Sequence, residues 1–244
     1  MKMENLILVT PEVFISLSIM FLLILGVFKN NSSKLIQNIA LIVLLISAVI
    51  IFNETFAIKE ITLFNDSVII DYLSSFMKIV TLLSAFLVLV ISSSYLRSLK
   101  IFKIEYSILI LSSVLGMMIM ISSNDLIVFY MGLELQSLAL YVLATFNRDE
   151  IKSSEAGLKY FVLSALSSGL LLYGCSLIYG FTGSTNFNVI ANQLNSNEYA
   201  LTFGIVFILV GLAFQISAVP FHMWAPDVYE GSPTSVTLFI TMVP

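Results

Sequence analysis

The sequence predicts an all-α, polytopic membrane protein. Of its 244 residues, 59% are hydrophobic and only 11% are charged, and the mean hydropathy is +1.02. A helix needs about 20 apolar residues to cross the hydrocarbon core, and the chain is built largely of apolar runs of that length. These runs are apolar on all sides, whereas the strands of a transmembrane β-barrel alternate apolar and polar residues. A bundle of membrane-spanning helices is therefore the expected fold class.

Seven runs are long enough to span a membrane, and an eighth begins just before the last residue. We expect a single transmembrane helical domain over residues 1–244, with spans near residues 6–28, 35–52, 68–96, 106–123, 126–146, 156–181 and 199–219 and a truncated span from residue 236. The first run resembles a cleaved signal peptide only loosely, because it is too long and lacks a small-residue cleavage site. It is therefore expected to be retained as a span.

The basic residues are distributed unevenly between the two sets of loops. The connections after the first, third and fifth spans contain seven Lys or Arg residues, whereas the opposite side contains only Lys2 and Lys59. By the positive-inside rule, the basic loops face the cytoplasm or the mitochondrial matrix. This places the N-terminus on the outer side, periplasmic or intermembrane, of a bacterial or mitochondrial inner membrane. The sequence does not distinguish the two hosts.

Two further lysines, Lys78 and Lys159, fall inside predicted spans. Lys78 lies about two turns deeper than Asp71, at the outer end of the third span. From that depth its ammonium group either lines a hydrated interior or reaches the interface only with difficulty. Asp71 is typical of an interfacial residue. In the first span, Pro11 and Glu12 are typical of an ordinary helix start.

The fifth predicted span carries an acid at its centre. Glu134 lies about ten residues, or roughly 15 Å, from either end of that helix, too deep to reach water. Ser137 shares its helical face, and Gln136 and Tyr141 lie within two turns, which indicates a polar stripe turned toward the bundle. An ionisable group at this depth usually marks a pathway. The alternative is that Glu134 stays protonated and hydrogen-bonds a neighbouring helix.

The sixth predicted span opens with Glu155 and carries Lys159 one turn later. Alone, Lys159 would be interpreted as an interfacial anchor, but together with Glu134 on the preceding span it indicates an acid and a base along one polar pathway. Small residues in this span allow close helix packing: Ser164, Ser167, Ser168, Gly169 and Gly174. We expect the following connection, residues 182–197, to be an ordered outer loop with a short surface helix.

The seventh predicted span combines a polar side chain with helix breakers. Gln215 is buried by position, and Gly211 and Pro220 flank it. Pro220 weakens the helix one turn before it, and a broken helix at membrane depth is tolerated where it lines a hydrated cavity. The alternative, that Pro220 only ends the helix, is not excluded by the spacing.

The loop after Pro220 contains the only His and the only Trp of the chain, His222 and Trp224. Trp is typical of the membrane interface. One His, no Cys nearby and acids four or more residues away supply too few ligands for a metal site, so no metal is expected. The lone Cys175 has no partner for a disulfide.

Residues 219–233 read VPFHMWAPDVYEGSP. This stretch closely resembles the signature of subunit N, called chain 2 in mitochondria, of respiratory complex I, the proton-pumping NADH:quinone oxidoreductase. The DVYEGSP part is the discriminating one, because related pump subunits and multi-subunit cation/proton antiporters share only the PFHxWxPD start. Residues 132–138, GLELQSL, and 155–164, EAGLKYFVLS, match in the same order and spacing.

The resemblance implies a membrane-arm subunit built of two inverted, antiporter-like repeats, each with a broken helix. This chain would hold the first repeat and the start of the second. In that family the glutamate at Glu134 pairs with a lysine on the broken seventh helix, and the lysine at Lys159 is a nearby base. The family's lysine falls at Gln215, which cannot be charged. The predicted proton pathway comprises Glu134, Lys159, Lys78, Gln215 and His222, and the predicted broken-helix region contains Gly211 and Pro220.

The resemblance therefore implies a role in proton translocation coupled to electron transfer, as a non-redox subunit that is not catalytic alone. No cofactor is expected in this chain; NADH, FMN, iron–sulfur clusters and quinone would belong to partner subunits, because the sequence has no Gly-rich nucleotide loop and no Cys cluster. The expected partners are the other membrane subunits, the lipid bilayer and a second chain supplying the missing C-terminal helices, with no nucleic acid. The alternatives are a structural scaffold without pumping and a subunit of a cation/proton antiporter.

Overall fold

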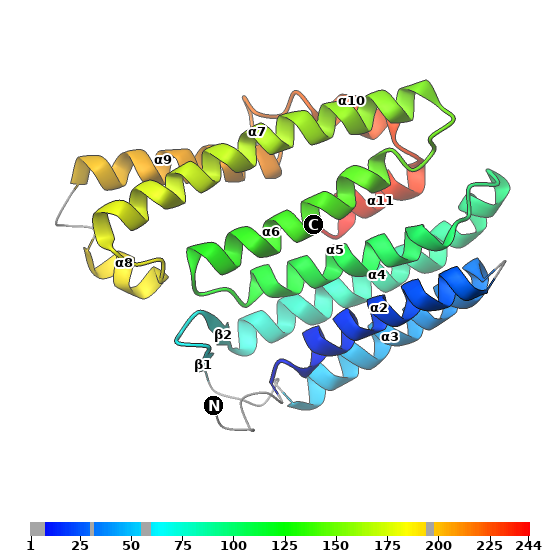
Figure 1. Ribbon diagram of the computed structural model, residues 1–244, viewed down its shortest axis with the longest axis horizontal. Coiled ribbons are helices and arrows are strands. Elements are labelled where there is room, and N and C mark those ends of the chain that lie inside the picture. Colours follow the sequence, from blue (N-terminus) through cyan, green and yellow to red (C-terminus); the bar gives the residue numbers. More distant parts are fainter. Residues whose placement is uncertain (1–7, 30–31, 55–59, 194–197) are drawn as a thin grey trace.

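The computed structural model describes residues 8–29, 32–54, 60–193 and 198–244, and it is almost entirely helical (Figure 1). Within these ranges, six helices are long and apolar enough to cross a membrane, and a shorter apolar helix covers Leu201–Gln215. The predicted class, an integral membrane protein of helices, is confirmed. The elements in chain order are α2 (Thr10–Phe28), α3 (Ser33–Glu54), β1 (Ile61–Leu63), β2 (Val68–Ile70), α4 (Tyr72–Ser98), α5 (Ile104–Ile121), α6 (Leu126–Ala144), α7 (Ile151–Thr182), α8 (Phe187–Gln193), α9 (Glu198–Gln215), α10 (Ala225–Gly231) and α11 (Thr234–Met242).

The third predicted span starts later than the sequence suggested. Residues 68–70 form strand β2, which pairs with β1 in an antiparallel hairpin. Helix α4 begins at Tyr72 because Asp71 caps it: the Asp71 carboxylate accepts the Ser74 N–H at 2.7 Å, and the Ser74 hydroxyl accepts the Asp71 N–H at 3.0 Å. This reciprocal capping box fixes the helix start. Asp71 is thus a helix cap rather than only an interfacial residue.

Other predicted boundaries shift by a few residues. Helix α7 begins at Ile151, within the predicted loop, and α9 ends at Gln215, before the predicted end of the seventh span. The short helix expected in the loop after the sixth span is α8. Residues 6–7 of the first predicted span, and Lys2 and Lys59, lie outside the described residues.

The long helices run side by side in Figure 1, with their ends in two groups. One end holds the β1–β2 hairpin and the starts of α2, α4 and α6, and we call it the hairpin end. The other holds α10 and the α6–α7 connection, and we call it the α10 end. Helices α2, α3, α4 and α5 pack against one another as a four-helix group, and α6 joins this group to α7 and α9.

Backbone hydrogen bonds tie the loops of the hairpin end together. Ile69 N–H donates to the Ser122 carbonyl at 2.8 Å, which joins β2 to the α5–α6 turn. The side-chain amides of Asn124 and Asn186 both donate to the Asp66 carbonyl, at 2.8 and 2.9 Å. The turn, the hairpin and the loop before α8 therefore form one ordered surface.

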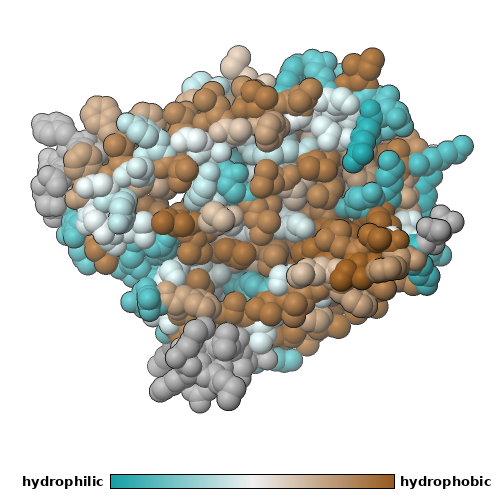
Figure 2. All heavy atoms as spheres, in the orientation of Figure 1, coloured by the Kyte–Doolittle hydropathy of each residue, from teal (hydrophilic) through white to brown (hydrophobic). Residues whose placement is uncertain are grey.

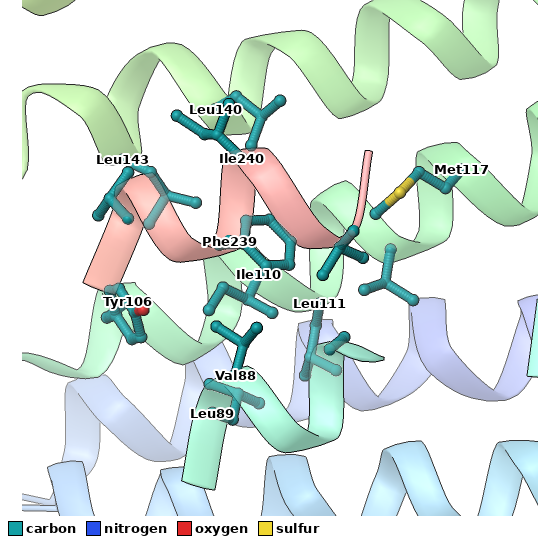
Figure 3. Packing of buried hydrophobic residues seen from close by; sticks show 14 of the residues in the cluster. Val88, Leu89, Tyr106, Ile110, Leu111, Met117, Leu140, Leu143, Phe239 and Ile240 are labelled. Atoms are coloured by element: carbon teal, nitrogen blue, oxygen red, sulfur yellow. The ribbon is translucent and has the colours of Figure 1, made fainter. Parts of the chain in front are cut away.

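The largest apolar core extends from α2 and α3 through α4, α5 and α6, and α11 packs into it against α4 and α6. Figure 3 shows Phe239 and Ile240 of α11 among Ile110 and Leu111 of α5 and Leu140 of α6. Outside this core many large apolar side chains are exposed, as expected of surfaces that face lipid. In Figure 2, apolar side chains dominate the middle of the visible face and polar ones gather toward its two ends.

Glycines let two helix pairs approach closely. A Cβ on Gly132 of α6 would lie 2.8 Å from the backbone nitrogen of Met120 in α5, and one on Gly116 of α5 would lie 2.5 Å from that of Gln136. Gly174 of α7 and Gly204 of α9 form a similar contact. Because backbone cannot yield as a flexible side chain does, the contacts of Gly116 and Gly132 fix the rotation of α6 about its axis.

Candidate functional site

Glu134 lies at the middle of α6 and faces away from α5. Gly132 and Gln136 contact α5, and Glu134 is two residues from each, or about 200° around the helix. Its side chain is half-buried, and its Oε1 atom is buried without a hydrogen-bond partner among the described residues. The packing of α6 on α5 thus turns this carboxylate toward α7.

Hydroxyl groups line the contact between α6 and α7 on both sides of Glu134. Tyr130, one turn before it, interacts with the Glu134 carboxylate and with Ser168 of α7. Further along, the Tyr141 hydroxyl donates to Ser164 of α7 at 2.6 Å. We call these groups, together with Ser137, the hydroxyl seam. A hydroxyl both donates and accepts a hydrogen bond, so each of these groups can exchange a proton with a neighbouring donor or acceptor.

The described part of the chain provides no lysine or arginine that pairs with Glu134. Lys159 is not close to it, because α6 and α7 run antiparallel and Tyr160 stacks edge-on against Tyr141. Residue 159 is therefore level with about residue 142, which is roughly 12 Å along the axis from Glu134. The structure does not bring together the acid and the base that the sequence placed on one pathway.

Lys159 instead belongs to a charged cluster at the α10 end. Its ammonium group lies 2.7 Å from Asp227 of α10 and 2.9 Å from Glu155, one turn earlier on α7, and its side chain is 43% exposed. Lys152 and Glu230 form a second, more exposed pair between the same two helices at 3.2 Å. The cluster lines a surface depression of about 150 Å³. These ion pairs hold α10 against the first turns of α7.

Lys78 is fully inside the bundle. Its ammonium group lies 2.5 Å from the carboxylate of Glu12, and the two residues are only 5% and 9% exposed. Lys78 thus lies inside the bundle and not at the interface, and the expected hydration of that interior stays a prediction. Sequence reasoning missed Glu12, which resembled an ordinary helix start. The available signal was that Glu12 and Lys78 both lie near the hairpin end of their spans, where a buried lysine needs a counter-charge.

Gln215 is the last residue of α9 and lines a cavity of about 490 Å³. Gln136 of α6 lines the same cavity, and its Oε1 atom is buried without a partner within the described ranges. Trp224 and Tyr229 contribute the aromatic side of the wall. Two amides thus face one space beside α6, where they can hydrogen-bond to water or to a polar group.

Helical structure is interrupted around Pro220. Helix α9 ends at Gln215, Ser217 adopts φ of +55°, and α10 begins at Ala225. Both helices pack along α7. The indole N–H of Trp224 donates to the Phe214 carbonyl at 3.0 Å, so one carbonyl freed by the break is satisfied internally.

The two remaining predicted residues differ in their surroundings. Gly211 packs on α7: a Cβ there would lie 2.6 Å from Leu171, and the Gly211 carbonyl accepts the Ser167 hydroxyl at 3.3 Å. His222 is exposed in the turn between α9 and α10 and is not part of the cavity wall. Within the described residues, no group of three or more His, Cys, Asp or Glu side chains could hold a metal ion.

The fold and the site define a class: an integral membrane bundle of helices that encloses ionisable side chains and contains an interrupted helix. Residues 123–244 match a family more specific than this class, described as NADH:quinone oxidoreductase/Mrp antiporter, TM. The chain belongs to this family.

Individual relatives agree with the resemblance to subunit N. The chain is 71% identical over 242 residues to NADH-quinone oxidoreductase subunit N of Pelagibacter ubique, covering 99% of this chain and 51% of the relative. It is 53% identical over 242 residues to the subunit N of Bartonella bacilliformis, covering 98% and 49%. The resemblance inferred from the signature is confirmed. The chain spans about half the length of the curated relatives it matches.

A solved structure supports the antiporter-like fold. The chain is similar to a chain of respiratory complex I from Thermus thermophilus with bound aureothin, with a TM-score of 0.82 and 29% sequence identity. The match covers 96% of this chain and 50% of the other. The predicted fold class is therefore confirmed along nearly the whole sequence.

Proposed function

We propose that the chain takes part in proton translocation coupled to electron transfer, as part of a subunit N in the membrane arm of an NADH:quinone oxidoreductase. The observation that carries the proposal is Glu134, a carboxylate at the middle of an apolar helix with one buried oxygen that has no partner in the described part of the chain. The cost of an ionisable group at this depth favours a role in a pathway over a role in packing. The similarity to relatives named subunit N supports the same conclusion.

In this proposal Glu134 is the central proton acceptor of the chain. The hydroxyl seam extends from it toward the α10 end, where Tyr141 donates to Ser164. A proton enters each hydroxyl on an oxygen lone pair while the original proton leaves to the next acceptor, so no side chain has to become charged. The amides of Gln136 and Gln215 line a cavity beside α6 that can hold water. Lys159, ion-paired with Asp227 and Glu155, would mark the α10 end of the route, and His222 would lie beside it at the break.

The redox chemistry is assigned to partner subunits in this proposal. NADH, FMN, the iron–sulfur clusters and quinone would bind elsewhere in the complex, and this chain would carry no cofactor. Its exposed apolar side chains on α2, α3 and α4 would contact lipid or other membrane subunits. The second antiporter-like repeat would come from the remainder of the same protein or from a second chain. The hairpin end would face the periplasmic or intermembrane side, as the loop charges indicate.

The test is the proton-to-electron ratio of the assembled complex with Glu134→Gln. We expect the ratio to fall while NADH oxidation by the peripheral redox sites persists, because glutamine keeps the shape of the side chain and cannot be protonated. The matched control is Glu150→Gln, which neutralises an exposed glutamate just before α7. An unchanged ratio in the Glu134 variant, with assembly intact, would contradict the proposal.

One observation favours the scaffold as a second candidate function. At the position where the family carries a lysine, this chain has Gln215, and the described residues give Glu134 no cationic partner. A chain that only fills a position in the membrane arm would tolerate both features. The Glu134→Gln experiment separates the two candidate functions. If this chain is only a scaffold, the complex that contains the variant should assemble and translocate protons as before.

A further inference from the structure

A second buried acid and base lie outside the site described above. Glu12 of α2 and Lys78 of α4 form an ion pair with 2.5 Å between Oε1 and Nζ. Helices α2 and α4 both pack on α3 and on α5, so the pair lies in the interior of the four-helix group and bridges it. It is separated from the hydroxyl seam by α5 and α6.

The burial of the pair argues against a purely mechanical role. Transferring both charges out of water is costly, and replacing a buried ion pair by apolar residues of similar size is often neutral or stabilising. The surrounding helices are already joined by apolar packing through buried residues such as Leu82, Ala85 and Leu89. Holding α2 and α4 together therefore does not require charged side chains. Proton exchange, in contrast, requires ionisable ones.

Glu12 also has an unused acceptor. Its second oxygen, Oε2, is buried and has no hydrogen-bond partner within the described residues. Glu12 is thus only 9% exposed, and only one of its two carboxylate oxygens has a partner among the described residues. An open acceptor position beside an ammonium group is what a transferable proton requires.

The pair lies close to the hairpin end. Glu12 is the third residue of α2 (Thr10–Phe28), and Lys78 is the seventh residue of α4 (Tyr72–Ser98). Both helices start at that end, so the pair is within about two turns, or roughly 10 Å, of it. Glu134 is the ninth residue of α6, which starts at the same end. The pair is therefore nearer to this face of the bundle than the central acid.

We propose that Glu12 and Lys78 form a second proton-transfer pair of the pathway, on the hairpin side of the bundle; this inference rests on the proposed function. The ammonium of Lys78 gives one proton to the carboxylate of Glu12, which leaves a neutral amine and a neutral carboxylic acid. Glu12 then releases that proton toward the hairpin end, and Lys78 takes up another from the interior. One proton has moved, and the original ion pair is restored.

The test exploits the difference between lysine and arginine. Lys78→Arg keeps a positive charge that can pair with Glu12, but a guanidinium does not give up its proton in a protein. The double variant Glu12→Gln/Lys78→Met removes both charges, so neither partner is left unpaired. The proton-to-electron ratio of each assembled complex is measured in membrane vesicles, with Glu60→Gln, an exposed change at the hairpin end, as the control.

We expect both variants to assemble and to lose part of the proton translocation, while Glu60→Gln retains all of it. A wild-type ratio in either assembled variant would overturn the inference and make the pair a structural link. Glu134→Gln is measured alongside. If Glu134→Gln lowers the ratio and the Lys78 variants do not, only the second pair is refuted; if Glu134→Gln has no effect, the proposed function itself fails.

Discussion

Glu12 and Glu134 are both carboxylates within apolar helices, yet their surroundings differ in kind. Glu12 has an ammonium group at 2.5 Å, whereas Glu134 has hydroxyl groups and, among the described residues, no cation. Hydroxyls can accept from a protonated acid or donate to a carboxylate, so the surroundings of Glu134 accommodate either form. The carboxylate of Glu12 is instead balanced by the charge of Lys78. The same side chain thus lies among hydroxyl groups in one place and forms half of an ion pair in the other.

Breaking the pair on one side should have the largest effect. Lys78→Met leaves the Glu12 carboxylate buried and unpaired, which costs about 3–5 kcal/mol when one partner of a buried pair is removed. We expect less assembled complex on native gels and a lower melting temperature. Full assembly of Lys78→Met would show that Glu12 is neutral or hydrated, contrary to the ion pair. Exchanging a lipid-facing methionine, Met20→Leu, is the matched control.

A change at Gly132 should disturb Glu134 and leave Glu12 in place. A Cβ in Gly132→Ala would meet the Met120 backbone at 2.8 Å, and overpacking of this kind typically costs about 1–3 kcal/mol. The expected result is a lower stability and a lower proton-to-electron ratio, because α6 must move away from α5. Gly169→Ala is the control, since a Cβ there meets nothing within 4 Å. Equal behaviour of the two alanine variants would argue against the close contact.

Removing one hydroxyl of the seam should have a smaller effect. Tyr141→Phe deletes the hydrogen bond to Ser164 but keeps the edge-on ring contact with Tyr160. A single hydrogen bond contributes about 0.5–1.5 kcal/mol to stability. We expect slower proton translocation at nearly unchanged assembly, compared with Tyr173→Phe on the exposed side of α7. Wild-type rates in Tyr141→Phe would remove this hydroxyl from the proposed route.

The smallest effect is expected for the exposed ion pair at the α10 end. Asp227→Asn leaves Lys159 paired with Glu155, and both side chains of the lost pair are about half exposed. Exposed pairs contribute little and are screened by salt. We expect no change in melting temperature at high ionic strength and at most a slight one at low ionic strength. A large loss of stability there would mean that the cluster is buried in the assembled complex.

Much of the fold could be predicted from the sequence, because apolar runs of span length leave few alternatives in lipid. The close packing of Gly174 was also predictable from residue type. The end of α9 at Gln215 was not, because the spacing left open whether Pro220 breaks the helix or only ends it. The start of α4 was not predictable, because Val68, Ile69 and Ile70 are as apolar as the residues of a membrane-spanning helix. Only the capping box at Asp71 marks the boundary between strand and helix.

The site was less predictable than the fold. Glu12 and Lys78 are 66 residues apart in sequence, and Lys159 and Asp227 are 68 apart. Composition and local spacing do not predict such ion pairs, because the pairs depend on how the helices pack. The sequence therefore placed Lys159 with Glu134 and left Glu12 without a partner, whereas the structure pairs Lys159 with Asp227 and Lys78 with Glu12.

The most direct measurement is the infrared difference spectrum of the assembled complex between rest and NADH-driven turnover. If Glu134 carries the proton, a carboxylic acid band of the wild-type spectrum should disappear in Glu134→Gln and persist in Glu150→Gln. A spectrum of Glu134→Gln identical to that of the wild type would show that this carboxylate does not change its protonation state, and would contradict the account.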